Sequence, residues 1–220
     1  MSTPTRDHAF TLMEILVVIM IITVLAALAF PALDAVRMRG QQTAGLSNIR
    51  QVGAATLLYA GEHNFQLPGY TSGKAGHDRW PKVLSQYLKD VRAYALPGDP
   101  NNYIARKADP LSNTRNNTSF IMNGYNDLGA FGKADVQVTM LRIEYPATTL
   151  LLGTPKPSST HFFMDFLEPP HGNNKDLLNL RSYGDGSNYM FADGSARFIA
   201  EKDYNDTLWL VDKTFTIPNL

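Results

Sequence analysis

Residues 15–33 contain no charged side chain, and this stretch limits what the chain can fold into more than any other feature. At about 1.5 Å per residue, a helix over these residues is roughly 28 Å long, about the thickness of a membrane's hydrocarbon core. Glu14 lies at its front edge. An ionised carboxylate costs about 2.5–3.5 kcal/mol at the middle of a bilayer and less near the interface. A simple anchor does not need this acid, so Glu14 indicates that the segment also binds a partner.

Two ordinary interpretations of the segment stay open at this point. It can be a secretory signal peptide, because residues 27–29 form a small-x-small cleavage site that would leave Phe30 as the mature start. Against this, Arg6 is offset by Asp7, and Glu14 interrupts the place where the apolar region should begin. It can also be an amino-terminal anchor that is never cleaved.

A third interpretation comes from residues 9–19, which read A-F-T-L-M-E-I-L-V-V-I. They resemble the processing signal of type IV pilins and type II secretion pseudopilins. The resemblance implies that a prepilin peptidase cuts between Ala9 and Phe10 and that the new amino group of Phe10 is methylated. The family usually has Gly where this chain has Ala9. Because the cut precedes the apolar helix, the helix stays in the mature protein, and Pro31 matches a proline common late in that helix.

The resemblance also gives Glu14 a role in assembly. In pilin-like filaments the apolar helices bundle in the core, and this glutamate is thought to meet the methylated amino terminus of a neighbouring subunit. A buried acid is tolerated beside a cation, and removing one partner of such a pair costs about 3–5 kcal/mol. The alternative is that Glu14 snorkels to the lipid headgroups.

Composition limits what the rest of the chain can do. Its 20 Lys and Arg residues balance 20 Asp and Glu residues without a basic block, so no nucleic-acid partner is predicted. There is no cysteine, which excludes disulfides, thiolate zinc sites and cysteine nucleophiles. No nucleophile elbow or phosphate-binding glycine loop is present, and we therefore expect no enzyme.

Periodicity predicts the remaining elements. The long helix should continue to about Gly61, loosened or kinked at Pro31. Apolar residues at spacings of three and four predict its buried face, which comprises Leu46, Ile49, Val52 or Gly53, Thr56 or Leu57, and Tyr59 or Ala60. A short amphipathic helix is expected at 80–90, and strands are expected at 149–152, 188–192, 195–200 and 207–211. Asp193 and Gly194 predict a two-residue hairpin turn between the second and third of these strands.

Further segments resemble a subgroup of pilin-like proteins that has a large C-terminal domain. They are N-I-R-Q-V-G at 48–53, Y-A at 59–60, L-P at 67–68, L-P-G-D-P at 96–100, S-F-I-M-N-G-Y at 119–125 and N-Y-M-F-A-D-G-S at 188–195. The subgroup signature places a His nine residues before its Asp-Gly, where this chain has Tyr183. Leu96 likewise replaces the cysteine of a Cys-Pro-x-Asp-Pro element.

Two groups of side chains have metal-binding chemistry. The first lies in the long connection 153–183 and comprises His161, Asp165, Glu168 and His171. Their spacing matches no helix-face pattern, so a solvated loop is the favoured interpretation. Asp185 and Asp193 offer oxygens to Ca²⁺, which some related pseudopilins bind near the C-terminal end. Calcium takes six to eight oxygens, however, and turns explain both Asp-Gly pairs more simply. No cofactor is therefore expected.

The sequence thus predicts a leader at 1–9, a transmembrane or filament-core helix at 10–33 and an extracytoplasmic domain at 34–220. The expected fold is pilin-like α+β, in which a long N-terminal helix packs on a small antiparallel sheet. The resemblance implies a subunit of a type IV pilus-like filament or type II secretion pseudopilus. It would cross the inner membrane once, with its C-terminal domain in the periplasm or in an extracytoplasmic filament.

The implied partners are other filament subunits, the prepilin peptidase and methyltransferase, and the inner-membrane assembly platform. The alternative is a membrane-anchored extracytoplasmic domain that binds or hydrolyses a ligand. Such a protein would need neither Glu14 nor the sequence around Phe10.

Overall fold

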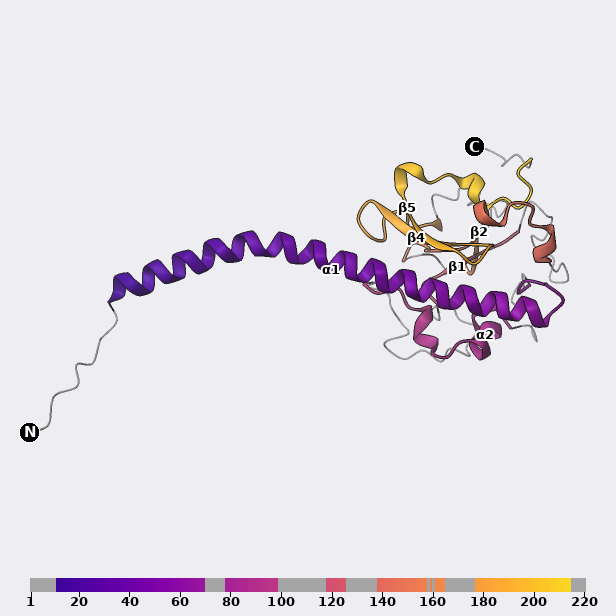
Figure 1. Ribbon diagram of the computed structural model, residues 1–220, viewed down its shortest axis with the longest axis horizontal. Helices are drawn as coiled ribbons and strands as arrows, with labels where there is room; N and C mark the ends of the chain where they lie inside the picture. Colours follow the sequence, from indigo (N-terminus) through magenta and orange to yellow (C-terminus); the bar gives the residue numbers. More distant parts are fainter. Residues whose placement is uncertain are drawn as a thin grey trace, which may run out of the picture. The chain divides into compact units, whose positions relative to one another are not determined.

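Helix α1, Leu12–Glu62, is the longest element of the chain (Figure 1). The computed structural model describes residues 11–69, 78–98, 118–125, 138–157, 159, 161–164 and 177–214. Residues 1–40 form one unit and residues 41–220 a second, so α1 contributes to both. The helix ends within one residue of the predicted end at Gly61. Pro31 lies inside it and does not end it, although a proline removes one backbone hydrogen bond.

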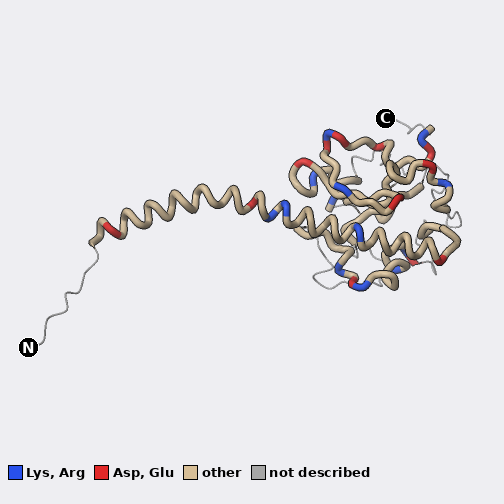
Figure 2. The backbone as a smooth tube through the Cα atoms, viewed as in Figure 1, with Lys and Arg blue, Asp and Glu red and all other residues tan. Residues whose placement is uncertain are grey.

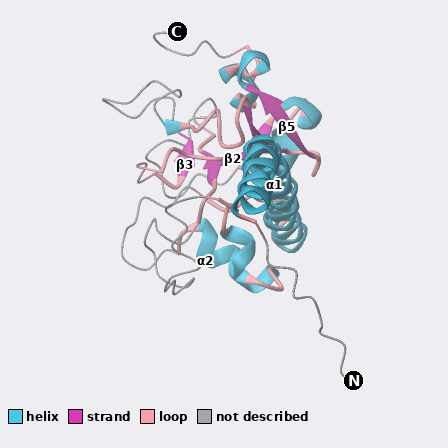
Figure 3. Cartoon of the chain, turned by 90° about the vertical axis from the view of Figure 1, so that its left-hand side faces the viewer, coloured by secondary structure: helices cyan, strands magenta, loops and turns pink. Residues whose placement is uncertain are grey.

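The second unit contains a five-stranded sheet in the order β3-β1-β2-β4-β5. The strands are β1 Ile121–Asn123, β2 Leu150–Gly153, β3 Phe163–Met164, β4 Gly186–Phe191 and β5 Ala196–Ala200. All neighbouring pairs are antiparallel except β1 with β3. A long N-terminal apolar helix packed against a mostly antiparallel sheet is a pilin-like α+β arrangement, which confirms the expected fold class (Figure 3).

The second half of α1 lies unusually close to β4 and to the turn before it. A Cβ atom added at Gly53 would lie 1.6 Å from Met190 Sδ, and one added at Gly45 would lie 1.9 Å from the Tyr183 hydroxyl oxygen. A larger side chain at either position would force the buried Tyr183 or Met190 side chain to move, so the two glycines allow this close approach. The predicted buried face is correct at Ile49, and buried residues continue at three- and four-residue spacings, as at Val52, Gly53, Thr56 and Ala60.

The two faces of the sheet carry separate apolar clusters. Met122 and Met190 pack with α1 residues and Trp80 on one face. Ile121 and Tyr189, their neighbours in the same strands, pack with Trp209 on the other. This alternation follows from the two-residue period of a strand. It explains why strands predicted as simple buried runs are apolar on both sides.

The predicted helix at 80–90 is shorter than expected. Helix α2 spans Trp80–Leu84 and continues as one 3-10 turn, Ser85–Tyr87. The Ser85 hydroxyl donates to the Lys82 carbonyl oxygen at 2.6 Å. Leu88 is already extended, with φ −96° and ψ 131°. Competition of a serine side chain with the helical backbone gives a local reason for this early end.

The hairpin turn is also longer than predicted. The Gly194 amide donates to the Phe191 carbonyl, and the Phe191 amide donates to the Ser195 carbonyl. Three residues therefore close the loop, and Gly194 alone of the Asp-Gly pair has a positive φ, +87°. This is the three-residue hairpin with a glycine bulge, whereas the predicted two-residue turn needs positive φ at both central residues.

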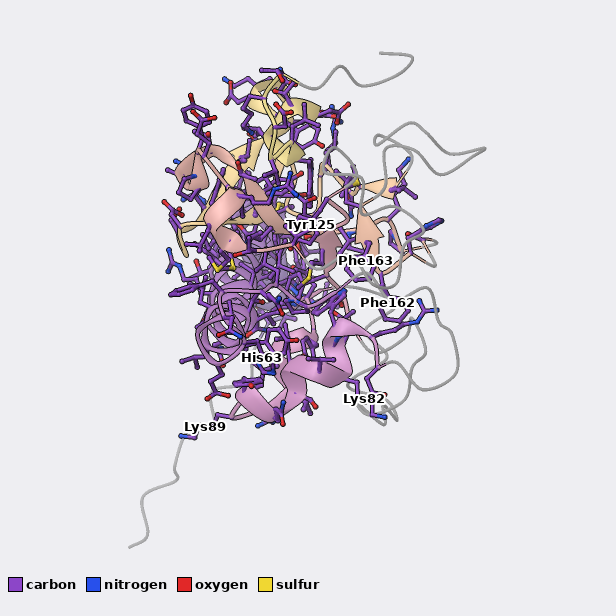
Figure 4. The ribbon with its side chains drawn as sticks, turned by 90° about the vertical axis from the view of Figure 1, so that its right-hand side faces the viewer. His63, Lys82, Lys89, Tyr125, Phe162 and Phe163 are labelled. Carbon is purple, nitrogen blue, oxygen red and sulfur yellow. The ribbon has the colours of Figure 1, made fainter. Side chains whose placement is uncertain are left out.

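Two other predictions are wrong. Residues 207–211 were expected to form a strand, but Asp206–Trp209 is a 3-10 helix whose first turn is capped by the Asn205 side chain accepting from the Thr207 amide. The connection 153–183 was expected to be a surface loop, but it contains the buried strand β3. Phe162 and Phe163 share an apolar cluster with Tyr125 (Figure 4). The Trp80 indole also donates to the Phe162 carbonyl at 2.9 Å.

Candidate processing and assembly segment

Thr11 and Glu14 together close the amino-terminal end of α1. The Thr11 amide donates to Glu14 Oε2 at 2.8 Å, and the Thr11 hydroxyl donates to the same oxygen at 2.9 Å. In return, the Glu14 amide donates to the Thr11 hydroxyl at 3.2 Å. The first helical bond of α1 also uses Thr11, whose carbonyl accepts from Ile15. This reciprocal arrangement is a capping box, in which a Thr and a Glu three residues apart satisfy orphan amides of the helix.

The capping box gives Glu14 a local role that the sequence analysis missed. The pattern Thr-x-x-Glu before an apolar run is itself a sequence signal for it. Substitutions at Glu14 therefore change two things, the end of the helix and the charge. Among the described residues, no Lys, Arg or His side chain forms an ion pair with Glu14. Both Thr11 contacts use Oε2, which leaves Oε1 for another donor.

The surface of α1 that follows is apolar on every side. The large hydrophobic side chains from Ile15 to Leu33 are 44–72% exposed in the isolated chain. Figure 2 shows no charged position along α1 between Glu14 and Asp34. The Thr23 hydroxyl donates to the Met20 carbonyl at 2.8 Å, so this polar group needs no water. In the described part of the chain, α1 is the one helix long and apolar enough to cross a membrane.

The position of cleavage falls just before the described residues. Ala9 and Phe10 lie outside them, so the structure gives no geometry for the predicted cut. Residues 4–30 match the prokaryotic N-terminal methylation motif. No curated protein and no solved structure matches the chain. The motif implies a prepilin-like protein that is processed by prepilin peptidase. Together with the apolar helix, it fits a pilin anchored in the inner membrane.

The first predicted metal group cannot be assembled from the described residues. His161 is described, whereas Asp165, Glu168 and His171 lie outside the described residues. Within the described ranges, no three His, Cys, Asp or Glu side chains lie close enough to hold a metal ion.

The second predicted group, Asp185 and Asp193, is split by strand β4. One aspartate precedes the strand and the other follows it, so they lie roughly 20 Å apart at 3.3 Å per residue. Asp193 Oδ1 accepts from the Ser195 amide at 2.9 Å and from its hydroxyl at 2.6 Å. Partial burial tends to raise the pKa of Asp193, but these hydrogen bonds and the charge of Arg197 lower it overall. The two aspartates therefore cannot share one calcium ion, and Asp193 serves the turn.

Three asparagines in the segments that carry the wider resemblance form hydrogen bonds between distant parts of the second unit. Asn48 Nδ2 donates to the Ala95 carbonyl at 2.8 Å. Asn188 Nδ2 donates to the Gln42 carbonyl at 2.8 Å. Asn123 Nδ2 bridges two carbonyl oxygens, of Leu150 at 2.8 Å and of Trp209 at 2.7 Å.

Tyr183, which stands where the subgroup signature has a His, is buried beside Gly45. Tyr183 therefore packs against α1 in this structure.

Proposed function

We propose that this chain is a structural subunit of a type IV pilus-like filament or a type II secretion pseudopilus. Residues 1–9 are the leader, residues 10–33 the membrane and filament-core helix, and residues 34–220 the extracytoplasmic domain. The observation that carries the proposal is the methylation motif at residues 4–30, which includes the start of α1 and most of its uncharged, exposed stretch at 15–33. The chain works by assembly and not by catalysis.

The exposed apolar surface supports this proposal energetically. Fully burying one Leu, Ile, Val, Phe or Met side chain is worth about 1.5–3 kcal/mol. Between residues 15 and 33 many such side chains have no cover from the described residues. A bilayer provides that cover before assembly, and a bundle of identical helices provides it afterwards. The inner-membrane assembly platform would move the helix from the first environment to the second.

Glu14 supports assembly over simple anchoring. In a bundle, a methylated amino terminus at Phe10 of a neighbouring subunit supplies the cation that Oε1 lacks within the described residues. The alternative function is a membrane-anchored binding or hydrolytic domain. In such a protein Glu14 would only cap the helix together with Thr11. The two functions differ in whether the charge of Glu14 matters.

The amino-terminal residue of the mature protein tests the proposal. In cells that contain prepilin peptidase, mass spectrometry of the terminal peptide should find methylated Phe10 as the first residue. Cells without the peptidase are the matched control and should retain Met1. A mature start at Phe30 would instead identify a secretory signal peptide, and retention of Met1 in both strains would identify a plain anchor.

A further inference from the structure

An apolar groove lies in the second unit, away from the proposed filament-core helix in sequence. It has a volume of about 390 Å³. Three segments line it: the end of α1, the connection before β2 and the hairpin loop. The lining residues are Leu57, Ala60, Gly61, Phe65, Met140, Leu141, Ile143, Pro146, Ala192 and Asp193. Among these described lining residues only Asp193 is charged, and its carboxylate already accepts from Ser195.

The rim of the groove exposes more apolar surface than its floor. Leu141 is 75% exposed, and Phe65 is 52% exposed. Phe65 also has a positive φ of 60°, which is uncommon for a bulky side chain. Its backbone is fixed there by two hydrogen bonds, from its own amide to Ala60 and from the Met140 amide to its carbonyl. A contiguous apolar surface of this kind on a water-facing domain marks a contact site.

The described part of the chain ends beside one wall of this groove. Val211 belongs to the same apolar cluster as Ile143 and Ala192. Lys213 Nζ donates to the Thr148 carbonyl at 3.4 Å, and Thr148 lies two residues after Pro146. The charge of Arg142 acts on the Asp212 carboxyl. Residues 211–213 therefore run along the segment that carries Met140, Leu141 and Pro146.

Six residues follow Thr214, and their sequence is F-T-I-P-N-L. They lie outside the described residues. Four of them are apolar and none has a charged side chain, which suits a groove whose described lining residues are apolar except Asp193. Six residues reach at most about 20 Å when extended, enough to cross from Thr214 to the groove. Pro218 has a fixed φ, which lowers the entropy lost when such a segment docks.

We propose that residues 215–220 of the same chain occupy this groove, with Phe215, Ile217 and Leu220 against its apolar wall. The C-terminal segment then covers Phe65 and Leu141 and closes the apolar surface of the domain. This contact is independent of the proposed filament function, because it uses no part of residues 1–40.

Disulfide formation in the full-length chain tests the proposal, and the absence of native cysteine makes the test clean. A variant carrying Leu141→Cys and Ile217→Cys is oxidised in membranes and mapped by mass spectrometry under non-reducing conditions. The expected product is a disulfide within one chain. The control variant pairs Ile217→Cys with Lys202→Cys, because Lys202 follows β5 at the end remote from the hairpin loop and should not react.

Two results would overturn the proposal. A disulfide between two chains would mean that a second copy occupies the groove. Equal, low yields from both cysteine pairs would mean that the segment lies elsewhere.

A labelling experiment keeps the test independent of disulfide geometry. Leu141→Cys alone should react slowly with a maleimide in the full-length chain. Adding Ile217→Asp and Leu220→Asp should speed labelling about tenfold or more, because each lost apolar contact is worth over 1.4 kcal/mol. Labelling at Lys202→Cys should not change. An unchanged rate at Leu141→Cys would show that the segment does not cover the groove.

Discussion

The two halves of α1 are one continuous helix with opposite relations to their surroundings. In the first half, Leu28 is 72% exposed and the large hydrophobic residues point outward on every side. In the second half, Ile49 and Val52 are fully buried, and glycine replaces a larger side chain where the helix meets Tyr183 and Met190. The first half presents a surface that needs other molecules. The apolar face of the second half is buried by other residues of the same chain. The two halves therefore differ in whether the described part of the chain itself buries their apolar side chains.

The charge of Glu14 provides the test with the largest expected effect. Glu14→Gln keeps a side chain that can complete the capping box with Thr11 but removes the charge. Both Glu14→Gln and Glu14→Ala should remain in the membrane and be lost almost completely from sheared extracellular filaments, because a neighbour's amino terminus would lose its partner. Membrane fractionation and immunoblotting of the sheared material measure the two outcomes.

Thr11→Ala is the matched control for the helix cap. It removes the hydroxyl that the Glu14 amide uses and leaves the carboxylate in place. Losing a cap costs about 1 kcal/mol, so this variant should assemble at a reduced level. If Glu14→Gln assembles like the parent while Glu14→Ala and Thr11→Ala fail, then the glutamate serves only the cap.

Because the second half of α1 is buried within its own unit, we expect residues 37–220 to fold without the first half of the helix. Removing residues 15–33 removes the apolar surface that the described residues leave exposed. The fragment should behave as one compact monomer in size-exclusion chromatography with light scattering. A stable oligomer would show that the globular domain itself drives assembly, contrary to the division proposed between the two halves of α1.

Gly53→Ala should destabilise this fragment by about 1–3 kcal/mol, because the new methyl group overlaps Met190 Sδ. Gly40→Ala is the matched control, since it lies in the same helix, outside the apolar groove, with nothing within 4 Å of its added Cβ. That control should be neutral or stabilising by about 0.5–1 kcal/mol. Urea unfolding of the two variants measures both. Equal stabilities would mean that α1 can move away from β4 at no cost.

The smallest predicted effect is a dependence of stability on pH at Asp193. The pKa of this carboxyl is lowered in the folded protein, so its contribution is present above the unfolded pKa and is lost as the pH falls through the folded value. Asp193→Asn keeps an acceptor for Ser195 and does not titrate. The parent should be more stable than this variant by about 0.2–1 kcal/mol at pH 7, and the difference should shrink as the pH falls below the ordinary range of an aspartate pKa. A constant difference in urea unfolding over this fall in pH would contradict the assignment.

Much of the fold could be predicted because its signals are local. The uncharged residues 15–33, the buried face around Ile49 and the Asp-Gly turn are each visible in a short window of sequence. The capping box at Thr11 and Glu14 is equally local, because the spacing Thr-x-x-Glu is itself its sequence signal. The methylation motif at residues 4–30 is recognisable for the same reason, since it is a short contiguous segment.

Other features needed partners distant in sequence. Strand β3 has two residues, and it is a strand only because Met122 and Asn123 of β1 pair with it. Residues 208–211 form a short apolar run, as a buried strand can. The Asn205 cap and the burial of Trp209 against the sheet instead give a 3-10 helix over Asp206–Trp209.

By itself the sequence determined that the chain carries a membrane-length helix with a prepilin-type start, because hydrophobic length and a processing motif depend only on neighbouring residues. Tertiary structure alone decided that Gly45 and Gly53 are contact points, that Asp185 and Asp193 lie apart, and that an apolar groove forms between the end of α1 and the hairpin loop. Those properties are distances between residues that the backbone brings together only on folding. Periodicity along a single element carries no information about them.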